Sequence, residues 1–330
     1  MAKCMTDTAN LTSVADAIRT KGRTSAPLFY PEGFISAIQA IQTGITPKLV
    51  ITTAPGASIT ATPAEGFKVV KGTAGTDGMC TLELPKAGTW NVTAMANSVS
   101  NSQHIVIGTQ NMLLPLYHDT FADNTWEEII AVCRTGIAPD SWAVGDSKTM
   151  DIGGTAYQVD IIGKNHDEYA DGSGTAPLTF QLHDCYSEAK QMYSTNLSGL
   201  GWKNTDIRLT YLPAILALMP AEVQNGIRAV NKKTSEGGNS TTIEMVSDTL
   251  FLLSEVEIFG TASSSVAGEG SQYDYYKAGN PKIKKREGVD EFWWERSSAS
   301  GGMFCRVRAN GQAGASNASN SLGVSFAFCF

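Results

Sequence analysis

The chain has 330 residues, of which 42% are hydrophobic and 17% are charged, and its formal net charge is -7. This length predicts two or three domains of ~150 residues each, and the composition is that of a globular protein. The acidic balance argues against a nucleic-acid partner, because phosphate contacts need clusters of Lys and Arg. No apolar run approaches the ~20 residues that span a bilayer, so we expect no membrane partner.

The first residues lack the apolar core of a signal peptide, which predicts synthesis and folding in a cytoplasm. The six cysteines show no paired close spacing, so neither a zinc site nor a disulfide framework is indicated. We therefore expect reduced, mostly buried thiols and no cofactor.

Residues 1–44 are predicted to form a helical module. Apolar residues recur at helical spacing from Leu11 to Ile18, and a second short helix begins at Pro31. Helices this short are marginal unless they pack on something else. The module is therefore expected to serve in anchoring and assembly.

Residues 45–112 change character. Short alternating strands follow one another, broken by Pro-Gly, Asp-Gly and Ala-Gly turns. Such frequent turns are typical of a small β-sandwich, and no catalytic cluster occurs among the residues. We interpret the segment as a spacer.

Residues 113–330 mix both element types, which makes the chain an α+β protein. A helix is expected after Asn124, two strands around Gly153-Gly154, and a buried strand at Leu250–Leu253. The largest predicted domain thus lies at the C-terminal end.

Three strands are predicted at that end, at Phe292–Ser297, Met303–Arg308 and Leu322–Phe330. Between Ser297 and Ser321 the chain is mostly Ser, Ala, Gly and Asn, which offer little apolar surface to bury. The pattern predicts two small-residue loops held by strands, and loops on a rigid scaffold often carry binding sites.

Strand alternation assigns directions to the side chains here. Cys305 and Val307 share one face of their strand, while Arg306 and Arg308 share the other. We expect the arginines to point outward, because burial of unpaired guanidinium groups is costly. The residues expected in the core are Cys305, Val307, Phe326 and Phe328.

Exposed aromatic and arginine side chains anchor partners, and Ser and Asn add adaptable contacts. This reasoning predicts a ligand-binding surface at the C-terminal strands and the tyrosine-rich loop before them. The predicted ligand-binding residues are Tyr273, Tyr275, Glu295, Ser298, Ser300, Gly302, Arg306, Arg308, Asn310, Gln312, Ala313, Ala315 and Asn317.

Three segments resemble known families. The segment "LTSVADAIRTKG…LFYPEGFISAIQAIQTG" resembles the N-terminal module of tail and minor structural proteins from phages and prophages of Gram-positive gut bacteria. The stretch "LPKAGTWNVTA" resembles an immunoglobulin-like repeat of bacterial surface and phage structural proteins.

The motifs "WAVGD", "IIGKNHD", "DIRLTYL", "LFLLSEVEIFG", "GSQYDYY" and "FWWERS…FCRVRANG…GVSFAFCF" resemble a family of unknown function in phage and surface proteins of Gram-positive bacteria. That family looks like a C-type-lectin-like fold of the formylglycine-generating-enzyme group. Glu295 departs from the apolar residue usual there, and we expect it on an exposed face.

The resemblance implies a phage tail protein, made in a bacterial cytoplasm and carried on the virion. Its lectin-like domain would bind a host cell-surface protein or glycan. Other virion tail proteins would be partners, and a homo-oligomer is expected, a trimer being one such arrangement.

In the same fold, target proteins of diversity-generating retroelements place their variable codons at the C-terminus. Codons with mutagenised adenines there, mostly Asn codons, reach Ser, Gly, Ala, Arg, Asn and others, but not Lys, Glu, Gln, Met or Trp. From Ser297 to Ser321, Met303 and Gln312 alone fall outside the reachable set. The composition is compatible with such diversification.

Two other classes of function stay open. His166, Asp167, Glu168 and Asp171 offer clustered ligands for a metal-dependent lectin or enzyme. Oxidase activity through Cys305 and Cys329, by analogy with the formylglycine-generating enzymes, would need a lowered thiol pKa for which no sequence signal exists. A purely structural tail component is the other class. We favour a binding protein that is not an enzyme.

Overall fold

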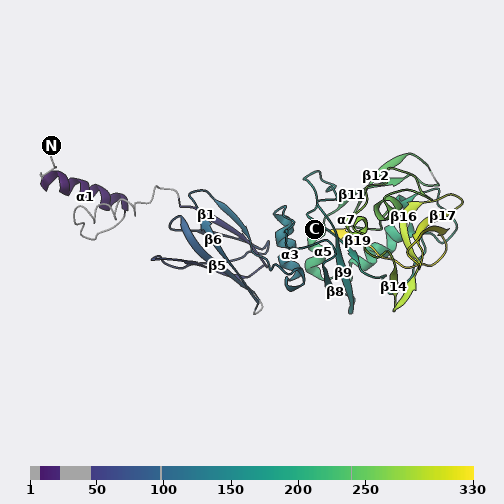
Figure 1. The fold of residues 1–330 in the computed structure, drawn as a ribbon, viewed down its shortest axis with the longest axis horizontal. Coiled ribbons are helices and arrows are strands. Elements are labelled where there is room, and N and C mark those ends of the chain that lie inside the picture. The colour runs from purple at the N-terminus through teal and green to yellow at the C-terminus, as the bar shows by residue number, and fades with distance from the viewer. Residues whose placement is uncertain (1–7, 23–45, 97–98, 239) are drawn as a thin grey trace. The chain divides into compact units, whose positions relative to one another are not determined.

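The computed structural model of the protein describes residues 8–22, 46–96, 99–238 and 240–330 (Figure 1). They form an α+β structure with mostly small sheets and few helices. No described helix is long and apolar enough to cross a membrane. The described residues divide into two compact units: one holds those up to Ile51, Ser58–Thr73 and Cys80–Leu114, the other Thr52–Ala57, Ala74–Met79 and Pro115–Phe330.

The N-terminal helix α1 covers Thr8–Gly22. Ala15 and Ile18, one helical turn apart, are buried, whereas Val14 is exposed. The second predicted helix, from Pro31, lies outside the described residues.

Two sheets follow in the first unit, with strand orders β4-β1-β7 and β3-β2-β5-β6, and the second of them is antiparallel. Along β4 and β5 every second residue is buried, and in β5 these are Trp90, Val92 and Ala94. This alternation gives each strand one face toward apolar neighbours. The strands are β1 (Lys48–Thr52), β2 (Ser58–Pro63), β3 (Val70–Thr73), β4 (Met79–Glu83), β5 (Gly88–Ala96), β6 (Val99–Ile107) and β7 (Met112–Pro115).

The second unit is built on a five-stranded sheet with the order β13-β19-β10-β9-β8. Its strands are β8 (Ser147–Ile152), β9 (Thr155–Lys164), β10 (Leu178–Leu182), β13 (Leu250–Phe251) and β19 (Ala327–Cys329). Three smaller sheets accompany it, formed by β11 (Val230–Ser235) with β12 (Ile243–Asp248), by β14 (Lys284–Arg286) with β15 (Val289–Glu291), and by β16 (Trp293–Ser298), β17 (Met303–Val307) and β18 (Ala313–Asn317).

Short helices cover these sheets. They are the 3-10 helices η1 (Phe121–Asp123) and η2 (Trp202–Asn204), the π-helix η3 (Ile207–Tyr211), and the α-helices α3 (Trp126–Arg134), α4 (Leu212–Leu216), α5 (Ala221–Gly226), α6 (Glu255–Phe259) and α7 (Asp274–Lys277). Helix α3 begins with a capping box in which Thr125 and Glu128 each bond the other's backbone N–H. This pairing satisfies two N–H groups that would otherwise lack partners.

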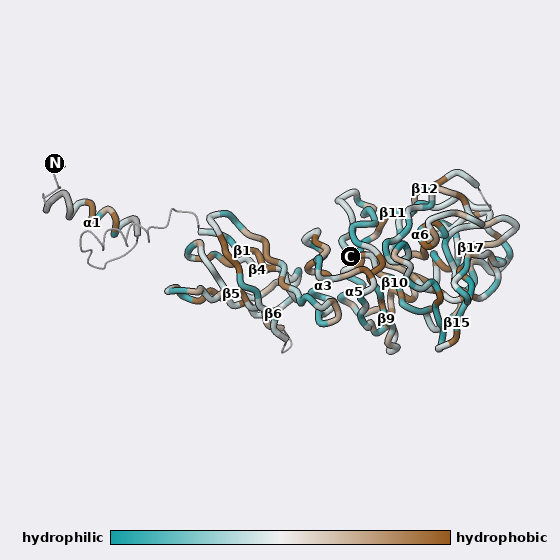
Figure 2. The backbone as a smooth tube through the Cα atoms, viewed as in Figure 1, coloured by the Kyte–Doolittle hydropathy of each residue, from teal (hydrophilic) through white to brown (hydrophobic). Residues whose placement is uncertain are grey.

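The core centres on β10, whose five residues are all buried. The ring of Phe180 stacks on Phe121 at 6.0 Å and on Phe328 at 5.3 Å, and it also contacts Phe330 at 5.3 Å. Figure 2 shows hydrophobic chain around β10 and the C-terminus. The C-terminal segment is therefore a structural element of the core.

Two features of the predicted C-terminal sheet are wrong. The last predicted strand, Leu322–Phe330, is shortened to β19 (Ala327–Cys329), which pairs with β10 and β13 and is buried on both faces. The third strand beside β17 is β18, from a stretch predicted to be a loop. Small residues form this strand because its backbone ladder with β17 needs no large side chain. Cys305 and Cys329 consequently lie in different sheets, and the described cysteines are buried free thiols.

Candidate functional site

The candidate ligand-binding surface lies on the sheet β16-β17-β18. β17 is its central strand, with Arg306 opposite Trp294 of β16 and opposite Gly314 of β18. Cys305 and Val307 are completely buried. The predicted burial of Cys305 and Val307 is therefore confirmed, Arg306 is half-buried and Arg308 is exposed. Phe304, on the same face as Arg306, is also completely buried, so the outer face leaves the core only from Arg306 onward.

Arg306 and Arg308 lie close together at the end of β17. The guanidinium of Arg306 stacks over the Phe292 ring at 4.2 Å, and its Nε donates to the Ala315 carbonyl at 3.1 Å. Arg308 is exposed and passes across Gly314, where an added Cβ would lie 2.8 Å from its Nε. Partial burial and the positive charge of Arg308 lower the pKa of Arg306. Two guanidinium groups this near each other favour an acidic group between them.

The hairpin turn after Arg308 is held in one conformation. The N–H of Arg308 donates to the Gln312 carbonyl at 2.7 Å, and the Gln312 N–H donates to Asn310 Oδ1 at 3.2 Å. Gly311 has a φ of 80°, the left-handed conformation that favours glycine. Asn310 and Gln312 are therefore presented to solvent on an ordered turn.

Strand β18 continues the surface as the edge of the sheet. Ala313 and Ala315 are half-buried, and Asn317 is exposed. The Arg308 N–H bonds the Gln312 carbonyl, and hydrogen-bonded pairs alternate along an antiparallel ladder, so Arg306 and Gly314 form the next such pair. The N–H groups of Ala315 and Asn317 therefore point away from β17. The edge offers small side chains and open backbone donors to a ligand.

The loop between β16 and β17 borders the same region. Ser300 is exposed, and Gly302 is half-buried with a φ of 79°. A Cβ at Gly302 would lie 2.5 Å from the Asn196 carbonyl, so this position requires glycine. Among the predicted residues, those brought together at the surface are Ser300, Gly302, Arg306, Arg308, Asn310, Gln312, Ala313, Ala315 and Asn317.

Four predicted binding residues are buried, and their assignment to the surface is wrong. Glu295 is 0% and Ser298 is 1% exposed. Other segments of the protein pack on both faces of β16, so neither set of alternating side chains reaches solvent. Tyr273 is buried because its hydroxyl bonds both oxygens of Asp167, at 3.0 and 2.8 Å. Tyr275 packs edge-on against Tyr276 at 5.1 Å and is also buried.

Glu295 is unusual even among the buried residues. Neither of its carboxylate oxygens has a hydrogen-bond partner among the described residues. Burial, reinforced by the negative charges of Glu255 and Glu269, raises the pKa of Glu295 well above its usual range. The surroundings of Glu295 therefore favour the neutral acid over the carboxylate.

Behind the surface, four buried side chains of alternating charge form a chain that the sequence analysis missed. Arg296 makes a two-pronged ion pair with Glu257, and the ammonium of Lys232 lies 2.7 Å from both Glu257 Oε1 and Asp167 Oδ1. Arg296 also donates to the backbone carbonyls of residues 233, 252 and 269. A signal existed for Glu257 alone, as the last residue of a Ser-x-x-Glu capping box at α6.

The charges in this chain keep one another ionised. Burial alone would raise the pKa of Asp167, but Lys232 and His166 lower it. Burial likewise opposes ionisation of Glu257, yet Arg296 and Lys232 hold its pKa below the usual value. The network joins β11, β16, α6 and the loop after β9 into a rigid scaffold under the candidate surface.

The alternative site at His166, Asp167, Glu168 and Asp171 is not assembled as a metal centre. Asp167 accepts from Lys232, Tyr273 and Thr179, and Asp171 pairs with Arg228 at 2.6 Å. No group of three or more His, Cys, Asp or Glu is arranged to hold a metal ion in the part of the chain that is described. The oxidase reading also lacks support, since burial raises the pKa of both Cys305 and Cys329.

Comparison with known proteins adds one similarity. Residues 179–330 match a family model described as a domain of unknown function, DUF6273. No curated protein and no solved structure matches the chain. The matched segment runs from within β10 through β19 and thus holds both the candidate surface and most of the buried ionic network.

Proposed function

We propose that the protein is a virion-associated receptor-binding protein, not an enzyme, whose β16-β17-β18 surface binds a protein or glycan on the host cell. In this proposal the second unit is a C-type-lectin-like domain and the sheets of the first unit are an immunoglobulin-like spacer. Residues 1–44 would attach the chain to other tail proteins, and the whole would act as a homo-oligomer.

The observation that carries the proposal is the placement of Arg306 and Arg308. Both guanidinium groups lie on the outer side of β17, next to an ordered polar turn and a strand edge of small residues. Arginines in such settings are frequent anchors of protein interfaces, because they combine a large contact area with forked hydrogen bonds. Their proximity favours a ligand with an acidic group.

The buried scaffold supports the same proposal. Binding residues are most effective on elements that do not rearrange, since ordering a loop on binding costs free energy. The residues of β16 are all buried, and Arg296 ties that strand to Glu257 of α6. A surface of variable side chains on such a scaffold is what retroelement diversification at the C-terminal codons would require.

The test is binding of the full-length protein to cells of the host strain. The double variant Arg306→Ala/Arg308→Ala should bind at least about tenfold more weakly, since a hot-spot arginine contributes on the order of 2 kcal/mol. Its melting temperature should stay near that of the parent, because surface changes move stability by about 0.5 kcal/mol. A matched control is Lys71→Ala/Lys277→Ala, which removes two exposed cations from elsewhere. Equal binding by the parent and the double variant would contradict the proposal.

A further inference from the structure

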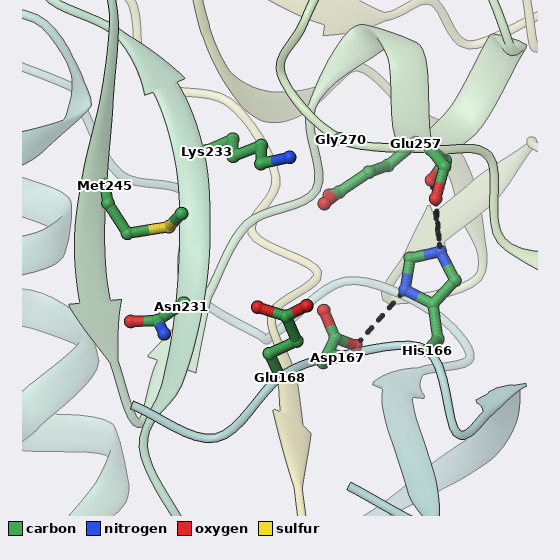
Figure 3. Close-up of a pocket in the computed structure, with 9 residues that line it drawn as sticks. His166, Asp167, Glu168, Asn231, Lys233, Met245, Glu257 and Gly270 are labelled. Atoms are coloured by element: carbon green, nitrogen blue, oxygen red, sulfur yellow. Dashed lines mark hydrogen bonds and ion pairs between the residues drawn. The ribbon is translucent and has the colours of Figure 1, made fainter. Parts of the chain in front are cut away.

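A cavity of about 280 Å³ opens beside the loop after β9, away from Arg306 and Arg308. Its walls come from that loop, from β11 and β12, and from the segment around Gly270 (Figure 3). All of these elements belong to the second unit. The proposed function makes no use of this space.

Two opposite charges project into the cavity without a partner. Lys233 and Glu168 both line it and both are exposed, and neither side chain has an ion pair or hydrogen bond within the described ranges. Figure 3 shows the Lys233 ammonium and the Glu168 carboxylate directed into the same space. The Asn231 N–H donates to the Glu168 carbonyl at 2.8 Å, so the backbone of Glu168 lies beside Asn231 of β11. Lys233 is two residues further along the same strand. Two residues of a strand span ~6.6 Å, so the two side chains start from separate points of the cavity wall and enter the same space of about 280 Å³.

The floor of the cavity is already neutralised. Asp167 and Glu257 reach it from below, but Lys232 bridges them and Arg296 pairs with Glu257. These four charges cancel. The charges left for a ligand are the cation of Lys233 and the anion of Glu168, and a simple anion or cation would satisfy one of them and leave the other unpaired.

The remaining wall residues suit a small polar molecule. The His166 ring is fixed by stacking on Tyr273 at 3.9 Å and by contact with Ser271 Oγ at 3.2 Å. Nδ1 of His166 lies 3.5 Å from Asp167 Oδ2, so this nitrogen faces the buried ionic network (Figure 3). Met245 contributes an apolar thioether on the opposite side, against which a short alkyl chain can pack.

We propose that this cavity binds a small zwitterion, with its ammonium group beside Glu168 and its acidic group beside Lys233. The charge separation of the two side chains selects such a ligand over singly charged molecules. The site is independent of the surface at Arg306 and Arg308, so either proposal can fail without the other.

The test is calorimetric or NMR titration of the full-length protein with glycine, 4-aminobutyrate and 6-aminohexanoate, which differ in the distance between their charges. Acetate and ethylammonium at the same ionic strength are the singly charged controls. At least one zwitterion should bind tenfold or more tightly than either control. Absence of binding by all three, or equal binding by acetate or ethylammonium, would overturn the proposal.

Variants locate the site. Lys233→Met and Glu168→Gln should each weaken binding of the best zwitterion at least fivefold, while the controls Lys277→Met and Glu65→Gln, at exposed positions outside the cavity, leave it unchanged. Melting curves show whether each variant is folded, and Lys233→Arg provides a charge-retaining variant that should keep most of the affinity. Arg306→Ala/Arg308→Ala should bind the zwitterion like the parent. Unaltered affinity in both cavity variants would refute the site.

Discussion

The Nη2 atom of Arg296 lies 2.9 Å from Glu257 Oε1, and both side chains are shut off from solvent. The pair connects β16 to α6. An ion pair in this environment stabilises a protein only if both members are present, because either one alone is an uncompensated buried charge.

Removal of one member of the pair should therefore strongly destabilise the fold. Arg296→Met leaves Glu257 with Lys232 as its remaining cation, and we expect the free energy of unfolding to fall by about 3–5 kcal/mol. Arg296→Met/Glu257→Leu should cost less than the sum of the single changes. Urea unfolding of the four proteins in this double-mutant cycle measures the coupling, and strict additivity would contradict the interpretation.

Glu295 gives a prediction about pH. Its pKa is raised in the folded state, so above the ordinary pKa of glutamate the unfolded chain loses a proton that the folded chain keeps. Stability from this residue is full at low pH and falls by up to about 1.4 kcal/mol per pH unit as the pH rises. The amide of Glu295→Gln cannot ionise, so the free energy of unfolding of this variant minus that of the parent should increase from pH 4.5 to pH 8.

Urea unfolding at the two pH values checks this. Glu65→Gln, at an exposed position in the first unit, is the matched control and should track the parent at both. A constant difference between Glu295→Gln and the parent would show that Glu295 is not a buried neutral acid.

Val307 tests the inward face of β17. The side chain is completely buried in the core of the second unit. Val307→Asp places a carboxylate there without a cation, which should unfold that unit and remove binding to cells. Loss of the near-UV circular dichroism signal is the expected measurement, and a native spectrum would contradict the packing.

Metal removal is expected to have no effect. The oxygens of Asp167 are occupied by Lys232, Tyr273 and Thr179. EDTA should leave the melting temperature and binding to cells unchanged, since a carboxylate held by three donors is a poor ligand for a hard cation. A large drop in melting temperature with EDTA, reversed by calcium, would restore the metal-dependent alternative.

Local patterns predicted part of this molecule well. Alternation along β17 predicted the burial of Cys305 and Val307 and the exposure of Arg308, but it missed the burial of Phe304 on the arginine side of the strand. The turn at Gly153-Gly154 and the cap before Trp126 are likewise local signals, and β8, β9 and α3 form as predicted.

The failures concern information that is not local. β16 reads as a half-exposed strand, yet its burial on both faces depends on β17, α6 and η2 packing around it. Small residues at Ala313–Asn317 predict a loop by composition, but β17 supplies a partner ladder that makes them a strand. The pairing of Arg296 with Glu257 and of Lys232 with Asp167 joins residues 39 and 65 positions apart, for which one sequence holds no signal.

Gly314 yields the last prediction, about how Arg308 is presented. The glycine lies opposite Arg306 in the ladder, and its φ is not in the left-handed range, so alanine is compatible with the backbone. A Cβ there would lie 2.8 Å from Arg308 Nε and 3.4 Å from its Cγ. Gly314→Ala should therefore displace the Arg308 side chain without any change of charge. Binding to host cells should weaken severalfold while the melting temperature stays within a few degrees, since a strand tolerates alanine at least as well as glycine. Gly108→Ala, where no atom lies within 4 Å of the new Cβ, is the control and should bind like the parent. Full binding by Gly314→Ala would mean that the position of the Arg308 guanidinium, as opposed to its charge, does not matter for recognition.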